Sequence, residues 1–377
     1  MRIFYLISII LFLKNSILYS QEEKLFPFKI EGSINADTGI VELNILSEAY
    51  YPKGVKKIEA KVENGRFLFT GYFPPYPQGV RLTYQNGRSS DLFVIEPGKQ
   101  SVLFNMNAHR ETPKVDNQSM KEYYQEYSNA FKHIWQKRDL LNMKWDSLAL
   151  IYKNKIPDNI KLKLDQERKE SYIESDSTLL EYVTTHPDSY IAFWKFIRLS
   201  SGFGYENIFD SILEKLSDSL KSTYAGKALA KNLKIAGLLA IDKKFPPFLA
   251  LDKLNNKLDV ALFLNNKYTL IDFWYSNCYP CRAQFPHLKD TYNEYKNKGF
   301  EIIGISTDKV RYKKMWLKAI EEHNLLWPQY WDKEGIESFK LSINAFPTNF
   351  LLDSEGKIIR KNIAPSELEE FLSKKLN

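Results

Sequence analysis

Two cysteines are the residues of this chain best suited to chemistry. Cys278 and Cys281 lie in the segment YSNCYPCRAQFPHL, and the 377 residues contain no other cysteine. At this spacing the thiols could form a structural disulfide, half of a metal site, a peroxidase pair or a redox-active dithiol. A bond across two intervening residues closes a very small loop, which restricts the unfolded chain little. Because a chain of this length buries a large core without the help of disulfides, we do not favour a purely structural disulfide.

A metal site at this pair is short of ligands. Structural zinc sites use about four protein ligands, whereas the chain offers two thiols here and His287 further along the same segment. We therefore expect neither a metal nor another bound cofactor. The peroxidase pair and the redox dithiol have to be judged from the elements that position the two cysteines.

Those elements favour a reactive thiol. The apolar run YTLIDFWY, residues 268–275, predicts a buried strand, and a helix is expected from Pro280 to about Asn297. Cys278 then lies at the start of the helix, where unpaired N–H groups and the positive end of the dipole favour the thiolate. Cys281 lies one turn inside. We therefore predict an exposed, attacking Cys278 and a more buried, resolving Cys281.

Residues 236–377 as a whole alternate between strand and helix patterns. A second strand, FEIIGIST, is followed by a second helix, RYKKMWLKAIEEHN. TNFLLD and KIIRKN flank the turn DSEG and predict a hairpin, and PSELEEFLSKKL predicts a closing helix. This order predicts an α/β domain with a mixed sheet.

Two stretches of this region resemble a known family. LIDFWYSNCYPC and NAFPTNFLLDSEGKII together resemble the thioredoxin superfamily and, more narrowly, extracytoplasmic thiol-disulfide oxidoreductases of the TlpA/ResA type. The resemblance covers about residues 236–377. It implies a thioredoxin-like fold, a redox-active disulfide between Cys278 and Cys281, and protein thiols or disulfides as partners. The direction of electron flow stays open: kept reduced by a membrane electron donor, the protein would be a reductase, for instance in cytochrome c maturation, whereas in equilibrium with its compartment it could oxidise or isomerise partners.

The resemblance assigns roles to residues around the dithiol. Phe346-Pro347 matches the family's cis-proline loop, which packs against the dithiol and pairs with bound substrate through the residue before the proline. Asp272 matches the buried acid six residues before the first cysteine, which accepts the proton of Cys281. Burial should raise its pKa toward the range where such transfer works; a structural, hydrogen-bonding Asp is the alternative. Trp274 matches a tryptophan beside the site, and either substrate binding or plain core packing explains it.

Three positions depart from the TlpA/ResA pattern. Gln284 stands where a glutamate usually follows the second cysteine, so more of the acid–base chemistry falls on Asp272. Asn277 replaces the tryptophan that commonly precedes the first cysteine, which makes the surface around the thiol more polar. The dipeptide Tyr279-Pro280 replaces the Gly-Pro of thioredoxin, so the reduction potential is not readable from relatives.

Two other functions stay open. Peroxidases of the peroxiredoxin type resemble one another in a Thr or Ser three residues before the reactive cysteine, where this chain has Tyr275. A degenerate thioredoxin-like domain could also act as a non-enzymatic binding scaffold, although an intact dithiol argues against it. Peroxide turnover and insulin-disulfide reduction separate the three hypotheses.

The upstream chain predicts two further regions. Residues 26–108 contain short runs of β-branched and aromatic residues, with an Asn64-Gly65 hairpin turn, and predict an antiparallel β-sandwich. Residues 117–232 predict a helical connector, broken at Pro157 and at His186-Pro187. An aromatic stripe in its first helix is interpreted as core packing rather than a ligand site. The β-rich region shows no chemistry, so docking or dimerisation is its default role.

The N-terminus predicts export. Residues 1–20 combine a basic start at Arg2, an apolar run and a small residue at Ser20, the layout of a cleaved signal peptide, with a retained anchor as the alternative. We therefore expect a periplasmic or otherwise extracytoplasmic protein. The formal charge of +7 is spread over mixed-sign stretches, so the sequence does not predict nucleic-acid binding. Oligomeric state is not predicted.

Overall fold

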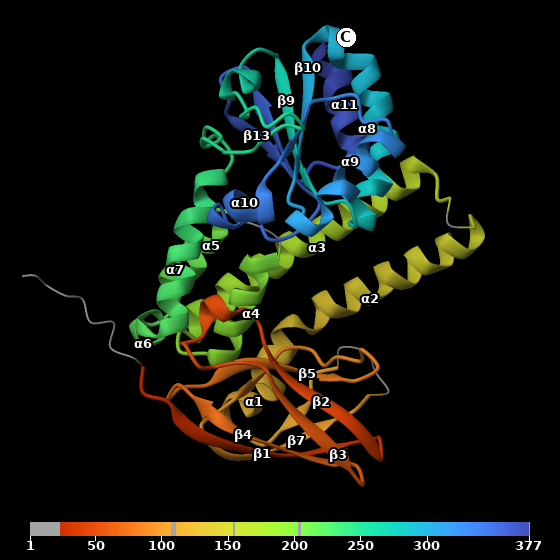
Figure 1. Ribbon diagram of the computed structural model, residues 1–377. Coiled ribbons are helices and arrows are strands. Elements are labelled where there is room, and N and C mark those ends of the chain that lie inside the picture. The colour runs from red at the N-terminus through yellow and green to blue at the C-terminus, as the bar shows by residue number, and fades with distance from the viewer. Residues whose placement is uncertain (1–22, 107–110, 154, 203–204, 377) are drawn as a thin grey trace, which may run out of the picture.

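The computed structural model describes residues 23–106, 111–153, 155–202 and 205–376 (Figure 1). The predicted signal peptide, residues 1–20, lies outside this range. Within the described chain, a β-sheet, a layer of helices and an α/β domain follow one another from the N-terminal to the C-terminal end (Figure 1).

The N-terminal sheet corrects the expected antiparallel sandwich. In the part of the chain that the structure describes, hydrogen bonds join eight strands into one sheet in the order β6-β5-β2-β3-β4-β1-β7-β8. The pair β1 and β7 is parallel, with Phe28 opposite Gly98, and all other neighbours are antiparallel. Alternating short strands are compatible with either architecture, because local patterns do not fix which distant strands pair. The strands are β1 (Phe26–Ile34), β2 (Thr38–Ile45), β3 (Ile58–Glu63), β4 (Arg66–Phe73), β5 (Gln78–Tyr84), β6 (Phe93–Ile95), β7 (Gly98–Phe104) and β8 (Lys114–Val115).

The hairpin between β3 and β4 forms as predicted. Asn64 and Gly65 have φ angles of 50° and 72°, and Glu63 pairs with Arg66 across the turn. Positive φ at both central positions is what a type I′ turn requires. The turn sets the register that buries Phe67 and Phe69 on the inner face of the sheet.

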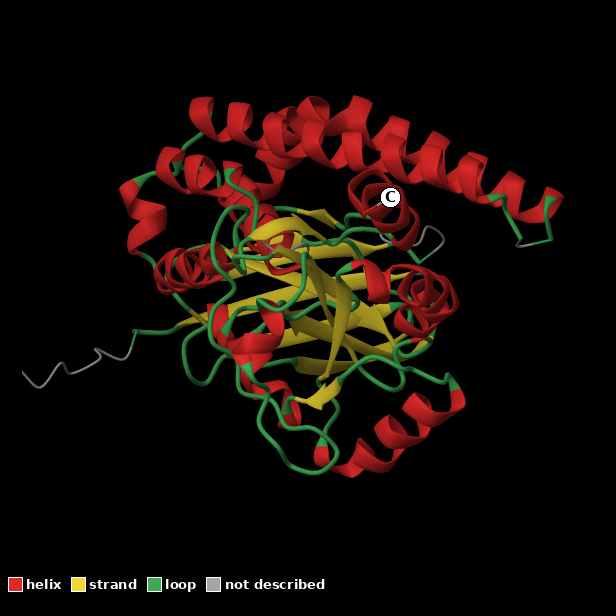
Figure 2. Ribbon diagram, turned by 90° about the horizontal axis from the view of Figure 1, so that it is seen from above, coloured by secondary structure: helices red, strands yellow, loops and turns green. Residues whose placement is uncertain are grey.

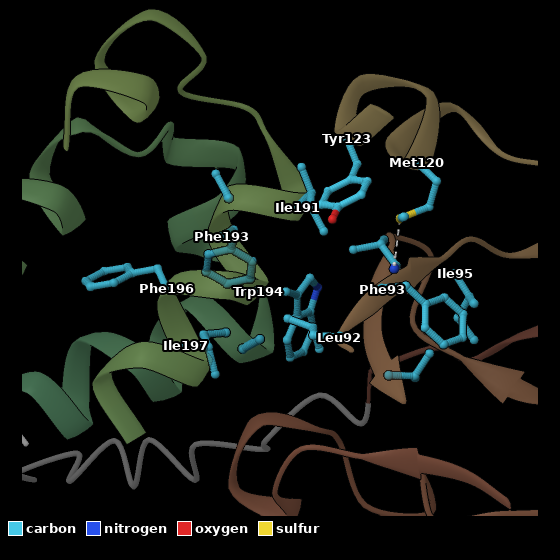
Figure 3. Close-up of a cluster of buried hydrophobic side chains, with 14 of the residues drawn as sticks. Leu92, Phe93, Ile95, Met120, Tyr123, Ile191, Phe193, Trp194, Phe196 and Ile197 are labelled. Atoms are coloured by element: carbon cyan, nitrogen blue, oxygen red, sulfur yellow. Dashed lines mark hydrogen bonds between the residues drawn. The ribbon is translucent and has the colours of Figure 1, made fainter. Parts of the chain in front are cut away.

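Helices cover this sheet and share its core. Trp194 of α4 is fully buried, donates its indole N–H to the carbonyl of Pro77 at 2.9 Å, and stacks on Tyr51 with ring centroids 5.2 Å apart. Figure 3 shows Trp194 of α4 and Leu92 lying between Phe193 of α4 and Phe93 of β6. One apolar cluster therefore spans the sheet and the helices, and the boundaries at residues 108 and 117 stay predictions. The helices are α1 (Gln118–Glu122), α2 (Ser128–Ile151), α3 (Asp158–Thr185), α4 (Tyr190–Gly202), α5 (Ile208–Lys215), α6 (Asp218–Ser222) and α7 (Tyr224–Ala236).

The long helices α2 and α3 form a hairpin that extends beyond the body of the molecule (Figure 2). On α2, Phe131, Ile134 and Leu141 are buried, whereas Leu150 and Ile151 near its end are exposed. The predicted break between α3 and α4 is confirmed, because Ser189 caps α4 by accepting a hydrogen bond from the backbone N–H of Ala192.

The C-terminal domain has the predicted thioredoxin-like order. Five strands of the described chain form a sheet in the order β11-β10-β9-β12-β13, with β9, β10 and β11 parallel and β12 and β13 antiparallel to their neighbours. Sequence patterns missed the short strand β11 and helix α10. The elements are β9 (Tyr268–Trp274), α8 (Tyr279–Tyr295), β10 (Phe300–Ser306), α9 (Lys313–Glu322), β11 (Gln329–Trp331), α10 (Ile336–Lys340), β12 (Thr348–Asp353), β13 (Ile358–Lys361) and α11 (Pro365–Leu376).

Apolar residues pack on both faces of this sheet. Residues of α8 and α11 cover the face that carries Leu270 and Trp274, and the segment 239–263 covers the face that carries Ile271 and Phe273. Lys361 of β13 donates a hydrogen bond to the carbonyl of Tyr205, which ties the domain to the helical layer. Among the described helices, none combines the length and the apolar character needed to cross a membrane.

Candidate active site

Cys278 and Cys281 form a disulfide at the start of α8. Their Cα atoms are 5.3 Å apart. Cys278 is the N-cap: its sulfur accepts a hydrogen bond from the backbone N–H of Cys281 at 3.2 Å, and its carbonyl accepts one from the N–H of Arg282 at 3.1 Å. Pro280 occupies the first turn, where it displaces no intrahelical hydrogen bond. The predicted strand-to-helix position of the pair is confirmed, and the helix begins one residue earlier than expected.

The predicted difference in burial between the two cysteines is wrong for the disulfide form. Each residue is only 2% exposed. Both side chains belong to the apolar cluster that α8 forms with the sheet, because the bond turns the two sulfur atoms toward each other at the base of the helix. Both residues between them, Tyr279 and Pro280, are exposed to solvent, and Tyr279 is 75% exposed.

Asp272 lies beneath α8, on the face of β9 that carries Leu270 and Trp274. Its neighbours across the sheet are Gly304 of β10 and Asn349 of β12. The residue is 2% exposed, and its Oδ1 atom is buried without a hydrogen-bond partner among the described residues. Asn349 makes its amide hydrogen bonds with the backbone of Ile363 instead.

Burial raises the pKa of Asp272 to about 7. The cause is desolvation of the carboxylate, since removal from water penalises the charged form. The geometry does not favour the structural alternative, because a carboxylate that anchors the fold would use its oxygens as acceptors. Asp272 can therefore take up and release a proton near neutral pH.

The loop before β12 lies beside the dithiol segment. The Phe346–Pro347 peptide bond is cis, as the resemblance implies. The Phe346 ring meets the ring of Tyr275 edge to face, with centroids 5.6 Å apart. Tyr275 precedes Cys278 by three residues, so this contact joins the proline loop to the segment that carries the cysteines.

Trp274 does not line the surface. It is 1% exposed, donates its indole N–H to Oε1 of Gln329 at 3.2 Å, and meets Phe285 of α8 edge to face at 5.2 Å. A partner cannot reach this ring while α8 covers it. The predicted part in substrate binding is therefore corrected, and packing behind the disulfide explains the residue.

Sequence reasoning missed a buried carboxylate beside the dithiol loop. Asp308 is 3% exposed and accepts hydrogen bonds from the backbone N–H of Ser276 at 2.8 Å, the Ser276 hydroxyl at 2.7 Å and the Ser306 hydroxyl at 2.8 Å. Ser276 stands two residues before Cys278. The sequence positions of these residues could have revealed the contact. Ser306 ends β10 and Ser276 follows β9, and the carboxyl ends of parallel neighbouring strands meet at one edge of a sheet.

An apolar surface adjoins the proline loop. A hollow of about 550 Å³ is lined by residues that include Phe346, Phe339 and Ile336. Phe339 is 68% exposed and Ile336 51% exposed. Exposed apolar side chains that gather beside a polar rim are typical of protein-binding surfaces. No cluster of three or more His, Cys, Asp or Glu side chains that could hold a metal occurs among the residues that the structure describes.

Comparisons with known proteins agree with a thioredoxin-like thiol-disulfide oxidoreductase domain. The model of the AhpC/TSA family matches residues 241–361. The thiol-disulfide oxidoreductase ResA of Bacillus thuringiensis subsp. konkukian is 30% identical over 139 residues, which are 36% of this chain and 79% of that protein. ResA of Halalkalibacterium halodurans is 26% identical over 43% of this chain and 90% of its own length. The thioredoxin domain of a thiol-disulfide oxidoreductase from Bacteroides vulgatus is 36% identical, with a TM-score of 0.34, over 37% of this chain and 99% of that one. Through its C-terminal domain, this chain belongs to the ResA-like thiol-disulfide oxidoreductases of the thioredoxin superfamily.

Proposed function

We propose that this enzyme is exported and exchanges disulfides with protein partners through Cys278 and Cys281, acting as a reductase. The observation that carries the proposal is the disulfide at the first turn of α8, on the sheet face that buries Asp272. A helix N-terminus stabilises a thiolate, and a buried carboxyl group can accept a proton. The helix α8 and the strand β9 therefore supply the thiolate and the proton acceptor that disulfide exchange requires.

The first step is attack by Cys278. In the reduced enzyme, the Cys278 thiolate attacks one sulfur of a partner disulfide; the bond from Cys278 to the partner forms, the partner bond breaks, and the second partner sulfur leaves as a thiolate. We assign attack to Cys278 because it is the N-cap and its sulfur accepts a hydrogen bond from the Cys281 N–H in the first turn of α8. Exposure does not support the assignment, since both cysteines are equally buried as the disulfide.

The second step is resolution by Cys281. Asp272 accepts the Cys281 proton, and the resulting thiolate attacks the Cys278 sulfur, which restores the internal disulfide and releases the partner in reduced form. Two electrons pass from the enzyme to the partner. Burial raises the pKa of Asp272 to about 7, so this carboxyl group can take up and release a proton near neutral pH. Gln284, one turn after Cys281, cannot take this role because an amide does not titrate.

The surface around the dithiol supports a protein as partner. Tyr275, Tyr279 and Phe339 are all exposed, and Phe346 joins the first of these to the hollow beside α10. Aromatic side chains that are rigid and partly apolar are favoured at protein interfaces. We propose that the backbone of Phe346, before the cis-proline, pairs with an extended segment of the partner.

Export and the source of electrons complete the proposal. Residues 1–20 would direct the chain out of the cytoplasm and be removed. In that compartment the Cys278–Cys281 disulfide has to be reduced again after each turnover, and we propose a membrane electron donor for this step. Cytochrome c maturation is the process that this assignment favours.

Insulin-disulfide reduction tests the proposal. The wild-type enzyme with dithiothreitol should accelerate insulin precipitation, and Cys278→Ser should reduce the rate to that of dithiothreitol alone. Full activity of Cys278→Ser would overturn the assignment. A wild-type enzyme that is inactive toward insulin but turns over peroxide would instead be a peroxidase, and inactivity in both assays would favour a binding scaffold.

A further inference from the structure

A second hollow lies away from the dithiol and is lined by residues of the N-terminal region and of the helices α2, α3 and α4. These helices are labelled in Figure 1. Its volume is about 630 Å³, within the range of pockets that hold small organic ligands. Four cationic side chains and one carboxylate line it: Arg81, Arg138, Lys195, Arg198 and Asp91.

The single carboxylate of the lining is already paired. Asp91 accepts from Lys195 at 2.6 Å and is bridged by Arg198. Burial alone would raise the pKa of Asp91, but the two cations outweigh burial and hold that pKa well below its usual range. Asp91 is therefore ionised at neutral pH, and its one negative charge leaves the lining with an excess of positive charge.

Aromatic rings, among them Phe131 and Trp135 of α2, also line the hollow. Tyr127 stacks on Phe131 with centroids 4.4 Å apart, and Phe131 stacks on Trp135 at 6.2 Å. This is the aromatic stripe of α2, and its first half lines the hollow as well as filling core. Further along α2, the Arg138 guanidinium lies 4.7 Å from the centre of the Tyr172 ring of α3.

Arg138 of α2 is held in place by contacts with α3. Its Nε donates to the Ser171 hydroxyl at 3.2 Å, and its Nη2 donates to the Ser171 carbonyl at 3.3 Å. The acids that influence it are Asp176 and Glu174. Glu174 forms an ion pair with Lys137 at 2.8 Å, and burial raises the pKa of Asp176 to about 6. Neither acid lines the hollow.

We propose that this hollow binds a small organic anion, with its carboxylate or phosphate on the arginines and an apolar or ring-bearing body against the aromatic wall. Guanidinium groups match the geometry of both anions, and an aromatic wall favours a flat apolar body. The site is distinct from the dithiol, and the proposal does not depend on the redox function.

Calorimetric titration of the full chain tests the charge requirement. The probes are 2-naphthoate, 1-naphthyl phosphate and the neutral 2-naphthalenemethanol, which share a ring system and differ in charge. We expect at least one anion to bind about tenfold or more tighter than the neutral alcohol. Equal binding of the alcohol, or no binding of either anion up to about 10 mM, would overturn the proposal. The carboxylate and phosphate arms show which head group the arginines prefer.

Two pairs of variants test the location. Arg138→Gln should weaken the anion about tenfold, whereas Lys144→Gln, an exposed cation of the same helix, should leave binding unchanged. Ser175→Trp fills the hollow from α3 without changing charge and should abolish binding, whereas Ser177→Trp, exposed on the same helix, should not. Ser175→Trp decides the matter if Arg138→Gln does not fold. Wild-type affinity in a folded Ser175→Trp variant would contradict the site.

Discussion

The ionisation of Asp272 makes a quantitative prediction about stability. Burial raises the pKa of this carboxyl group from 3.8 to about 7, and each pKa unit corresponds to about 1.4 kcal/mol. In the folded protein the group therefore keeps its proton at pH values where the unfolded chain has lost it. The stability that it contributes is greatest below the unfolded pKa and is lost as pH rises toward the folded pKa. The total loss is about 4 kcal/mol, of which about 3 kcal/mol falls between pH 5 and pH 8.

Asp272→Asn isolates this effect, because the amide does not titrate. The substitution carries a constant cost for a buried amide, so the useful quantity is the change with pH in the difference between variant and wild type. Urea titrations of the oxidised proteins should show the variant gaining about 3 kcal/mol on the wild type from pH 5 to pH 8. Asp290→Asn, at an exposed position of α8, should differ from wild type by less than about 0.5 kcal/mol at either pH. A difference for Asp272→Asn that does not change with pH would refute a buried, titrating carboxyl group at this position.

Three further substitutions test other parts of the structure. Asp308→Ala leaves buried donors of Ser276 without an acceptor and should cost about 2–4 kcal/mol in urea titration; a loss below about 0.5 kcal/mol would contradict the network. Gly65→Ala places a side chain at a φ of 72° and should cost about 1 kcal/mol, measured as a lower melting temperature, whereas an unchanged melting temperature would argue against the type I′ turn. Asp91→Asn leaves buried Lys195 without its counter-charge and should destabilise by about 3–5 kcal/mol; a neutral effect in thermal melting would show that the pair is not buried in solution.

Local patterns predicted the elements of the C-terminal domain well. Period-two and period-3.6 patterns, together with Pro280 and the turn after β12, identify strands and helices because these signals depend on near neighbours in sequence. The strand β11 was not predicted, because its three residues, Gln329–Trp331, are too few to show a period-two pattern. In the N-terminal region, the parallel pairing of β1 with β7 depends on contacts between residues about 70 positions apart, which local patterns do not encode.

Properties that arise from packing were harder to predict. The sequence predicted the position of Cys278 at the start of the helix. It did not predict the burial of this residue, because burial depends on how α8 packs against the sheet. Trp274 occupies an inward position of β9, so its indole packs on Phe285 instead of reaching solvent. Asp308 needed the adjacency of β9 and β10 to be recognised as the acceptor for Ser276.

The order of attack by the two cysteines is the central claim, and mixed-disulfide trapping tests it most directly. Cys281→Ser and Cys278→Ser each keep one thiol, and both can be reacted with 5,5′-dithiobis(2-nitrobenzoate) and with an oxidised protein substrate at neutral pH, then analysed by intact mass. We predict that Cys281→Ser reacts rapidly and accumulates a stable mixed disulfide through Cys278, whereas Cys278→Ser reacts far more slowly and traps no partner. Faster reaction and partner trapping by Cys278→Ser would contradict it.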